Sequence, residues 1–329
     1  MAARLSGACV VLMALSTVLW SAGAAALAGS VSEVGAPALS GQHRPGAMDA
    51  GDQEVISPAR YRRVVADALD HYRAVIAKSW KHTEVSSPTK WVEYSHDWRV
   101  RRVVDYGDHA IRISLHFKAG RDLRPEFLHQ LTELLSEDLA TAYARDPVLV
   151  DTARRLGLTA RLEADGQRVL GELFATAHPH KGQFRAEARR LLDKGRIDDV
   201  GTGELRVATL TAPLPAHRLL HAATRYRGTI RRYGAKWKID PALIAAVIAS
   251  ESDFNPMAMS KVPAFGLMQL APGSFERGTV RTGNPPPGPA ALLNPAKNIR
   301  LGAAYLHRLY YRDFSGVGVA KNRDRKSVV

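Results

Sequence analysis

The chain has 329 residues and a single cysteine, Cys9, which lies in an apolar N-terminal segment. If that segment is removed on export, the mature chain has no thiol, so disulfides, cysteine nucleophiles and cysteine-based metal sites are excluded. Acidic residues are scarce relative to basic ones, since 46 Lys and Arg against 32 Asp and Glu give a formal net charge of +14. A basic balance admits polyanionic partners, which include nucleic acid, anionic lipid and acidic cell-wall polymer.

Signature motifs of several enzyme classes are also missing. There is no G-x-S-x-G segment, which excludes the usual serine-hydrolase pattern. His217 and His221 have the spacing of a zinc-binding helix, but Arg218 stands where zinc proteases require Glu. The segment 316–318, Gly-Val-Gly, has no third glycine, so we interpret it as a loop and not as a nucleotide site. We therefore predict no metal site and no organic cofactor.

The N-terminus has the three-part pattern of a secretory signal peptide over residues 1–28. Arg4 is followed by a charge-free run to Leu19 and then by small residues that end at Ala28. We expect export to the periplasm with cleavage after Ala28; an uncleaved membrane anchor is the alternative. No apolar segment precedes Cys9, so we do not expect a lipoprotein cleavage site there, although membrane association by other means stays open.

Composition divides the rest of the chain into four parts. Residues 29–57 are rich in Gly, Ala, Ser and Pro without apolar periodicity, which predicts a flexible tether. Residues 58–208 are predicted to form a small α+β domain. Two prolines within residues 209–219 indicate a linker, and residues 220–329 form a second domain.

Within the first domain, the apolar residues after Pro58 recur at helical spacing and so fall on one face, which predicts a helix that starts at Pro58. Three aromatic or β-branched segments then predict strands, and two further helical patterns follow. The expected strands are residues 91–94, 98–106 and 110–117, and the expected helices are residues 125–144 and 147–157. Trp80, Trp91 and Trp98 could stack on sugar rings, but we favour packing inside the domain.

The most informative segment of the second domain is a predicted helix that begins at Asp240. Asp followed by Pro is a helix-start signal, and the next ten residues are apolar nearly all round, which is typical of a buried helix. Asn255 before a proline is expected to end it. Glu251 then lies in the last turn, where burial and the negative end of the helix dipole both raise the pKa of its carboxyl. A frayed surface helix end is the alternative for Glu251 taken alone.

Polar and small residues follow this helix closely. Ser260 comes nine residues after Glu251, and Gly266, Leu267, Met268 and Gln269 combine a small residue, an apolar pair and an amide with two donors and an acceptor. We interpret these residues as a cradle for a sugar ring. A carboxylic acid beside such a cradle is what general-acid chemistry on a glycan requires.

These two motifs carry a resemblance to a known family. E-S-x-F-N-P-x-A-x-S at Glu251–Ser260, followed by G-L-M-Q at Gly266–Gln269, resembles the soluble-lytic-transglycosylase (SLT) domain of lytic murein transglycosylases. The segments 263–265 and 270–272 resemble the membrane-bound lytic transglycosylase C branch in particular. The resemblance is strong over about residues 220–320. It implies an α+β chain whose second domain is mostly helical and lysozyme-like, of the goose type.

The resemblance also implies an activity without metal or organic cofactor. Glu251 would cleave the β-1,4 bond between N-acetylmuramic acid and N-acetylglucosamine of peptidoglycan without water, which leaves 1,6-anhydromuramyl products. Ser260 and Gly266–Gln269 would bind the substrate. A hydrolytic muramidase and a non-catalytic peptidoglycan-binding protein are the alternatives.

Charge and the C-terminal sequence add two expectations. Residues 220–329 hold 17 Lys and Arg against 6 Asp and Glu, which suits glycan strands bearing carboxylates, although ordinary solubilising charge is the alternative. Export removes nucleic acid as a partner; peripheral contact with a membrane or with cell-wall protein complexes stays open. The sequence has no A-Y-N segment of the kind relatives use to supply a cleft tyrosine. We therefore expect a C-terminal truncation and reduced activity.

Overall fold

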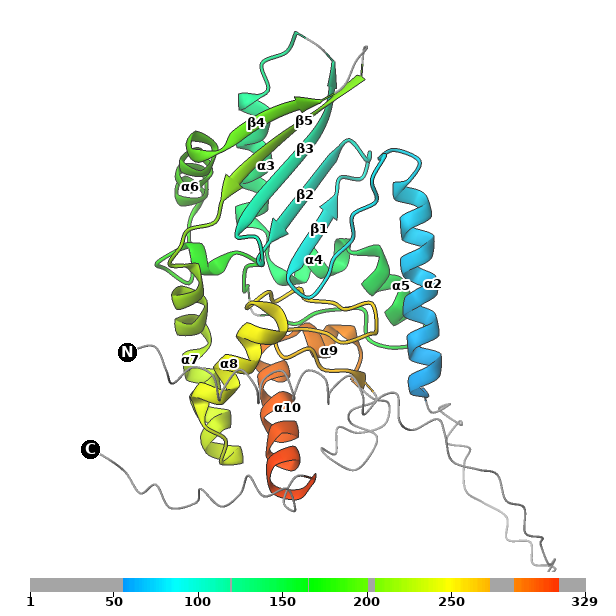
Figure 1. Ribbon diagram of the computed structural model, residues 1–329, viewed down its shortest axis with the longest axis vertical. Coiled ribbons are helices and arrows are strands. Elements are labelled where there is room, and N and C mark those ends of the chain that lie inside the picture. Colours follow the sequence, from blue (N-terminus) through cyan, green and yellow to red (C-terminus); the bar gives the residue numbers. More distant parts are fainter. Residues whose placement is uncertain (1–55, 119, 165, 201–204, 273–286, 314–329) are drawn as a thin grey trace, which may run out of the picture. The chain divides into compact units, whose positions relative to one another are not determined.

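The computed structural model describes residues 56–313 except for 119, 165, 201–204 and 273–286. The predicted signal peptide, almost all of the predicted tether and the segment 316–318 lie outside the described residues. The described residues belong to one compact unit, which begins at Ile56. It is α+β, as predicted, and combines one antiparallel sheet with helices (Figure 1). Among the described residues, no helix is long and apolar enough to cross a membrane.

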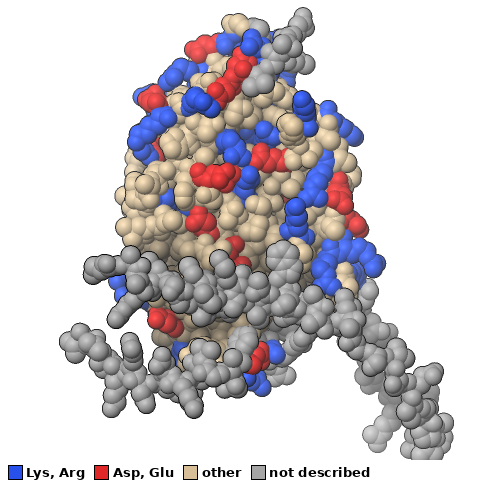
Figure 2. All heavy atoms as spheres, viewed as in Figure 1, with Lys and Arg blue, Asp and Glu red and all other residues tan. Residues whose placement is uncertain are grey.

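The sheet has five antiparallel strands in the order β1-β2-β3-β5-β4. Its strands are β1 (Lys90–Tyr94), β2 (Val100–Asp105), β3 (Ala110–Lys118), β4 (Arg196–Val200) and β5 (Leu205–Pro213). The first three confirm the predicted strands. Its outer surface is charged but balanced, with basic and acidic side chains interspersed (Figure 2). Glu84, for example, pairs with both Lys90 at 3.2 Å and Arg112 at 2.6 Å.

Strand β5 corrects the prediction of a linker over residues 209–219, because the strand runs through Pro213. Ala208, Leu210 and Ala212 are buried, and β5 lies between β3 and β4. Proline is tolerated at the end of β5 because β4 pairs with it only as far as Thr211, so no ladder continues on that side. The prolines therefore mark the end of a strand, and only the few residues after it connect to the next helix.

Helices pack against the sheet and against one another. They are α2 (Pro58–Ile76), α3 (Arg124–Ser136), α4 (Leu139–Arg145), α5 (Pro147–Arg155) and α6 (Lys181–Lys194), with a 3-10 turn η2 (Gly171–Leu173). α2 starts where Ser57 caps the Arg60 amide at 3.2 Å. The single helix predicted over 125–144 is two helices, because Asp138 accepts the Thr141 amide at 2.8 Å and starts a new one.

The tryptophans of this half are packing residues, as favoured from the sequence. Trp80 and Trp91 are buried, and Trp80 Nε1 donates to the Trp98 carbonyl at 2.9 Å. Trp98 is half-buried against the rings of Tyr72 and Tyr94. These rings attach the end of α2 to the sheet. They therefore have a packing role, and we look for the candidate site in the second half.

The second half is helical: α7 (Arg218–Trp237), α8 (Pro241–Ser252), α9 (Pro289–Leu293), α10 (Pro295–Arg308) and the π-helical turn η4 (Leu309–Asp313). α7 contacts both α8 and α10, and the three lie together below one end of the sheet in Figure 1. Contacts also join the two halves: Tyr61 of α2 meets the ring of Phe265 at 6.1 Å, and Asn255 Nδ2 donates to the Pro88 carbonyl at 3.0 Å. The helical half is therefore held against the sheet half on more than one side.

Candidate active site

Helix α8 presents the candidate acid. Asp240 caps it by accepting the Ala242 amide at 2.8 Å, and Pro241 occupies the first turn, as predicted. The helix ends at Ser252, earlier than the predicted stop at Asn255. The chain leaves it through Asp253 and Phe254, both in the left-handed region at φ 50° and 60°. Two successive non-glycine residues in that region are uncommon and need support from their surroundings.

Glu251 lies one residue before the end of α8 and is half-buried. Burial raises the pKa of its carboxyl above the ordinary value, in the direction expected from the sequence. The neighbouring Asp253 is also raised by burial, but the Arg218 guanidinium opposes that shift. Of these two carboxyls, only Glu251 has a burial shift that no nearby cation opposes, so it is the better placed to hold a proton near neutral pH.

Gly266 serves the packing of the loop that follows. Its φ is +73°, and a Cβ there would lie 2.3 Å from the Leu292 carbonyl oxygen and 2.5 Å from Asn298 Nδ2. The absence of a side chain lets the loop lie against the Leu292 carbonyl of α9 and the Asn298 side chain of α10, and the approach of this backbone to a ligand stays a prediction. Asn298 donates to the Phe265 and Leu292 carbonyls at 2.9 and 2.7 Å and accepts the Met268 amide at 2.8 Å.

Leu267 and Met268 face inward. Both side chains are buried, at 0% and 3% exposed, and Met268 packs on Gly302 of α10. The Leu267 carbonyl accepts Ser252 Oγ at 2.8 Å. These side chains fill the core beneath the loop, so a contact of Leu267 or Met268 with substrate stays a prediction and would have to use their main chain.

Ser260 braces its own loop. Its hydroxyl donates to the Val262 carbonyl and accepts the Ala264 amide, the latter at 3.1 Å. The hydroxyl thus uses its single donor and one of its two acceptor lone pairs within four residues.

Gln269 differs from the other residues of the predicted cradle. Its Nε2 donates to the Gly266 carbonyl at 3.0 Å, whereas its Oε1 is buried and has no hydrogen-bond partner among the described residues. Its φ of 43° is also left-handed. Buried acceptors are normally satisfied, so this oxygen needs a donor that the described protein residues do not supply, either a water molecule or a ligand.

The sequence reasoning missed three polar residues that organise this site. Arg218 pairs with Asp253, Asn255 donates across to Pro88, and Asn298 accepts the Met268 amide and so holds the loop at Gly266–Gln269. No local spacing marks these residues, because their partners lie 35, 167 and 30 residues away along the chain.

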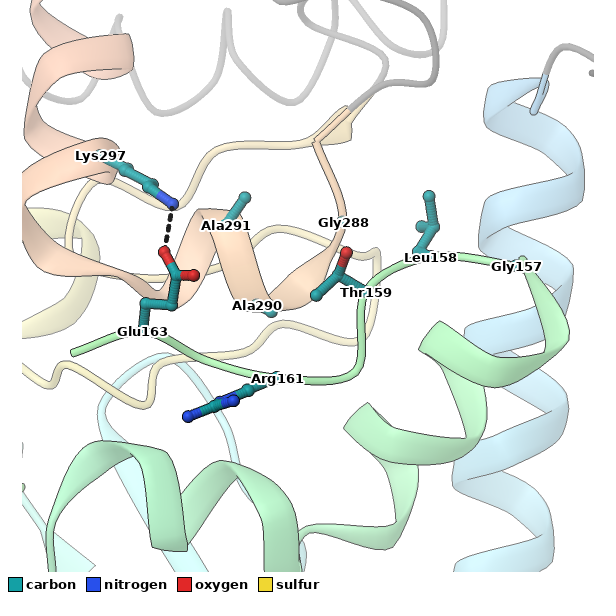
Figure 3. A pocket seen from close by; sticks show the side chains of 9 residues that line it. All are labelled: Gly157, Leu158, Thr159, Arg161, Glu163, Gly288, Ala290, Ala291 and Lys297. Carbon is teal, nitrogen blue, oxygen red and sulfur yellow. Dashed lines mark ion pairs between the residues drawn. The ribbon is translucent and has the colours of Figure 1, made fainter.

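A separate cavity of about 300 Å³ lies between the loop after α5 and the start of α10. Figure 3 shows Lys297 reaching Glu163, 3.5 Å apart, at its mouth. Its lining does not include Glu251 or Gln269. The lining residues are Gly157, Leu158, Thr159, Arg161, Glu163, Gly288, Ala290, Ala291 and Lys297.

Comparisons with known proteins agree with the motifs. Residues 228–316 match the family described as Transglycosylase SLT domain. Membrane-bound lytic murein transglycosylase C of Salmonella typhimurium (strain LT2) is 26% identical over 254 residues, which cover 74% of this chain and 66% of that protein. The protein of the same name from Histophilus somni (strain 2336) is 38% identical over 107 residues, which cover 32% of this chain and 30% of that protein.

The chain thus matches about two thirds of the length of the Salmonella relative, and the more similar match to the Histophilus relative is confined to a shorter segment. The resemblance predicted from Glu251–Ser260 and Gly266–Gln269 is confirmed. The chain carries a transglycosylase SLT domain and is related to the lytic murein transglycosylases.

Proposed function

We propose that the chain is a lytic transglycosylase that cleaves peptidoglycan, with Glu251 as its catalytic acid and base. The observation that carries the proposal is the half-buried carboxyl of Glu251 at the end of α8, whose pKa is raised by burial, within an SLT domain. The printed names of the relatives, lytic murein transglycosylase, support the same activity.

The reaction would divide into two proton transfers at one residue. Protonated Glu251 donates to the oxygen between N-acetylmuramic acid and N-acetylglucosamine, and the bond from that oxygen to C1 of N-acetylmuramic acid breaks. The N-acetyl carbonyl of N-acetylmuramic acid stabilises its C1. The C6 hydroxyl of the same sugar then attacks C1 and gives its proton to the Glu251 carboxylate, which restores the acid. One C–O bond is broken and one is formed, no water is consumed, and the product is a 1,6-anhydromuramyl sugar.

Gln269 supplies a point of contact with the substrate in this proposal. Its Oε1 can accept a hydrogen bond from a sugar hydroxyl or from the N–H of the acetamido group, which would satisfy an acceptor that the described residues leave open. The glycan strand is thus the partner that the site would bind. The signal-peptide pattern at residues 1–28 supports a periplasmic location, where peptidoglycan is found.

A hydrolytic muramidase is the alternative enzyme. Glycosidases that add water normally use a second carboxyl group as base or nucleophile. Asp253 is the nearest carboxyl along the chain, but Arg218 Nη2 holds its Oδ2 at 2.6 Å. That pairing supports the single-acid mechanism over the hydrolytic one.

The mass of the products separates these possibilities. Purified sacculi digested by the full chain should release muropeptides about 18 Da lighter than hydrolysis products, because ring closure at C6 replaces the addition of water. Reducing-end products would support the muramidase instead. Binding to sacculi without any release would support a non-catalytic peptidoglycan-binding protein.

A further inference from the structure

Arg218 is one of the most buried charged residues of the structure. It is the first residue of α7, it is 1% exposed, and its guanidinium lies 5.0 Å from the centre of the Tyr106 ring. A fully buried cation is costly unless it is paired and hydrogen-bonded. Arg218, at the junction of the sheet and the helical half, therefore needs acceptors that pair with its charge.

What Arg218 holds is the residue that ends α8. Its Nη2 donates to Asp253 Oδ2 at 2.6 Å, and its Nη1 donates to the Asp253 backbone carbonyl at 3.1 Å. The planar guanidinium can reach both acceptors at once because its donors are fixed in a fork. Side chain and backbone of Asp253 are thus fixed by one group.

The turn that Arg218 grips is conformationally expensive. Asp253 and Phe254 both have positive φ, which is a strained backbone conformation for residues other than glycine. A second contact from α7 supports the same turn, since the Tyr226 ring stacks on Phe254 with an interplanar angle of 8°. The backbone leaves α8 in this direction because α7 holds it there.

Glu251 lies two residues before this turn and depends on it. Burial raises the pKa of its carboxyl, and no described side chain forms a hydrogen bond or ion pair with it. The direction in which α8 presents this carboxyl therefore depends on the backbone of its last turn, which continues directly into Asp253.

We infer that Arg218 is a positioning residue for Glu251, acting through the turn at Asp253 and Phe254. The inference rests on the proposed function, in which Glu251 is the catalytic acid. Arg218 does not touch the substrate in this account; it joins the sheet half, through Tyr106, to the end of the helix that presents the acid.

The test compares Arg218→Met with the double variant Arg218→Met/Asp253→Asn. Methionine keeps an apolar stem but removes the fork, which leaves the Asp253 carboxylate without its partner and should lower stability. The added Asp253→Asn change removes that unpaired charge. Arg231→Met is the matched control, because Arg231 is an exposed residue of the same helix. Turnover on purified sacculi is measured at a temperature where circular dichroism shows every variant folded.

We expect kcat to fall about 10- to 100-fold in both the single and the double variant, with KM within about threefold of the unmutated chain. Arg231→Met should leave both constants unchanged. A double variant that is folded and retains kcat within threefold would overturn the inference, because a purely structural role would be restored along with stability. If Arg218→Met does not fold, Arg218→Lys carries the same comparison, since it retains the charge but loses the fork.

Hydrogen exchange supplies a readout that does not need activity. The amides of Asp253 and Asn255 donate to the Ala249 and Ser252 carbonyls at 3.1 and 2.9 Å. Their exchange should become at least about tenfold faster in Arg218→Met than in Arg231→Met. Unchanged exchange would show that Arg218 does not hold the turn. If the unmutated chain lacked turnover on sacculi, the proposed function and the catalytic role of Glu251 would be contradicted. Hydrogen exchange at Asp253 and Asn255 would still show whether Arg218 holds the turn.

Discussion

Ser252 Oγ donates to the Leu267 carbonyl at 2.8 Å and so joins the residue after Glu251 to the loop that contains Gln269. Ser252 is fully buried, and its hydroxyl also reaches the Ile248 carbonyl at 3.1 Å. The candidate acid and the candidate substrate loop are therefore held together by one hydroxyl. The two motifs that identify the family meet at this bond.

Replacing Ser252 by Ala tests that connection. The Leu267 carbonyl would lose a buried donor, so the free energy of unfolding should fall by about 1–3 kcal/mol. Ser136→Ala is the matched control, because Ser136 is a half-buried serine whose hydroxyl makes an exposed hydrogen bond to a carbonyl of its own helix, and it should change stability by less than about 0.5 kcal/mol. Urea unfolding followed by circular dichroism measures both. Equal effects of the two changes would contradict the structural role of Ser252.

Gly266→Ala tests the close approach of the loop to α9, which contains Leu292. The added Cβ would meet the Leu292 carbonyl at 2.3 Å, and the backbone at φ +73° would be strained as well. Gly157→Ala is the control, since Gly157 has φ +63° but no atom within 4 Å of the added Cβ. The control should cost about 1–2 kcal/mol for backbone strain alone.

Gly266→Ala should lower the unfolding free energy further than Gly157→Ala, or leave the chain unfolded. Thermal unfolding of both variants makes the comparison. A loss at Gly266 no larger than the loss at Gly157 would show that the loop can move away from Leu292.

Gln269→Ala tests contact with the glycan. If Oε1 accepts a hydrogen bond from a neutral sugar group, its loss should cost about 0.5–1.5 kcal/mol in kcat/KM on sacculi. Gln167→Ala, in the other half of the chain, should leave kcat/KM unchanged. Unaltered kinetics for Gln269→Ala would remove Gln269 from the site and leave its open acceptor to water.

Some features of the fold and the site could be predicted from the sequence, and others could not. Helix α8 was predictable because its signals are local: a capping Asp, a Pro in the first turn and an apolar run that ends on Glu251. The direction of the Glu251 pKa shift followed from the same run. The burial of the Leu267 and Met268 side chains could not be predicted, because an apolar pair in a motif reads the same whether it lines a cleft or fills a core.

The features that the sequence did not predict depend on contacts between residues that are distant along the chain. Arg218 and Asn298 act on residues that only the fold brings near, so no spacing could reveal them. Strand β5 was missed because Pro213 was interpreted as a break, whereas the register shows that β4 ends before it. The boundary between residues 58–208 and 220–329 remains a prediction, since the described residues belong to one unit.

The pH dependence of stability gives an independent test of the Glu251 environment. A carboxyl whose pKa is raised on folding binds more protons folded than unfolded, so its contribution is present below the unfolded pKa and is lost as pH rises through the folded value. Glu251→Gln removes this dependence. The variant should therefore match the unmutated chain near pH 4 and be more stable near pH 7.

Thermal unfolding of both proteins across that range measures the difference, and other raised carboxyls such as Glu137 cancel because both chains contain them. A constant difference at all pH values would show that burial does not perturb Glu251.

The most direct measurement is the turnover of Glu251→Gln on purified sacculi. The change keeps the shape of the side chain and removes the proton donor and the later base. General acid–base contributions are typically about 10²- to 10⁴-fold, and one residue serves both steps, so we expect a loss of kcat at or beyond the upper end, with sacculus binding retained. Activity within tenfold of the unmutated chain would contradict the assignment of Glu251 as the catalytic acid.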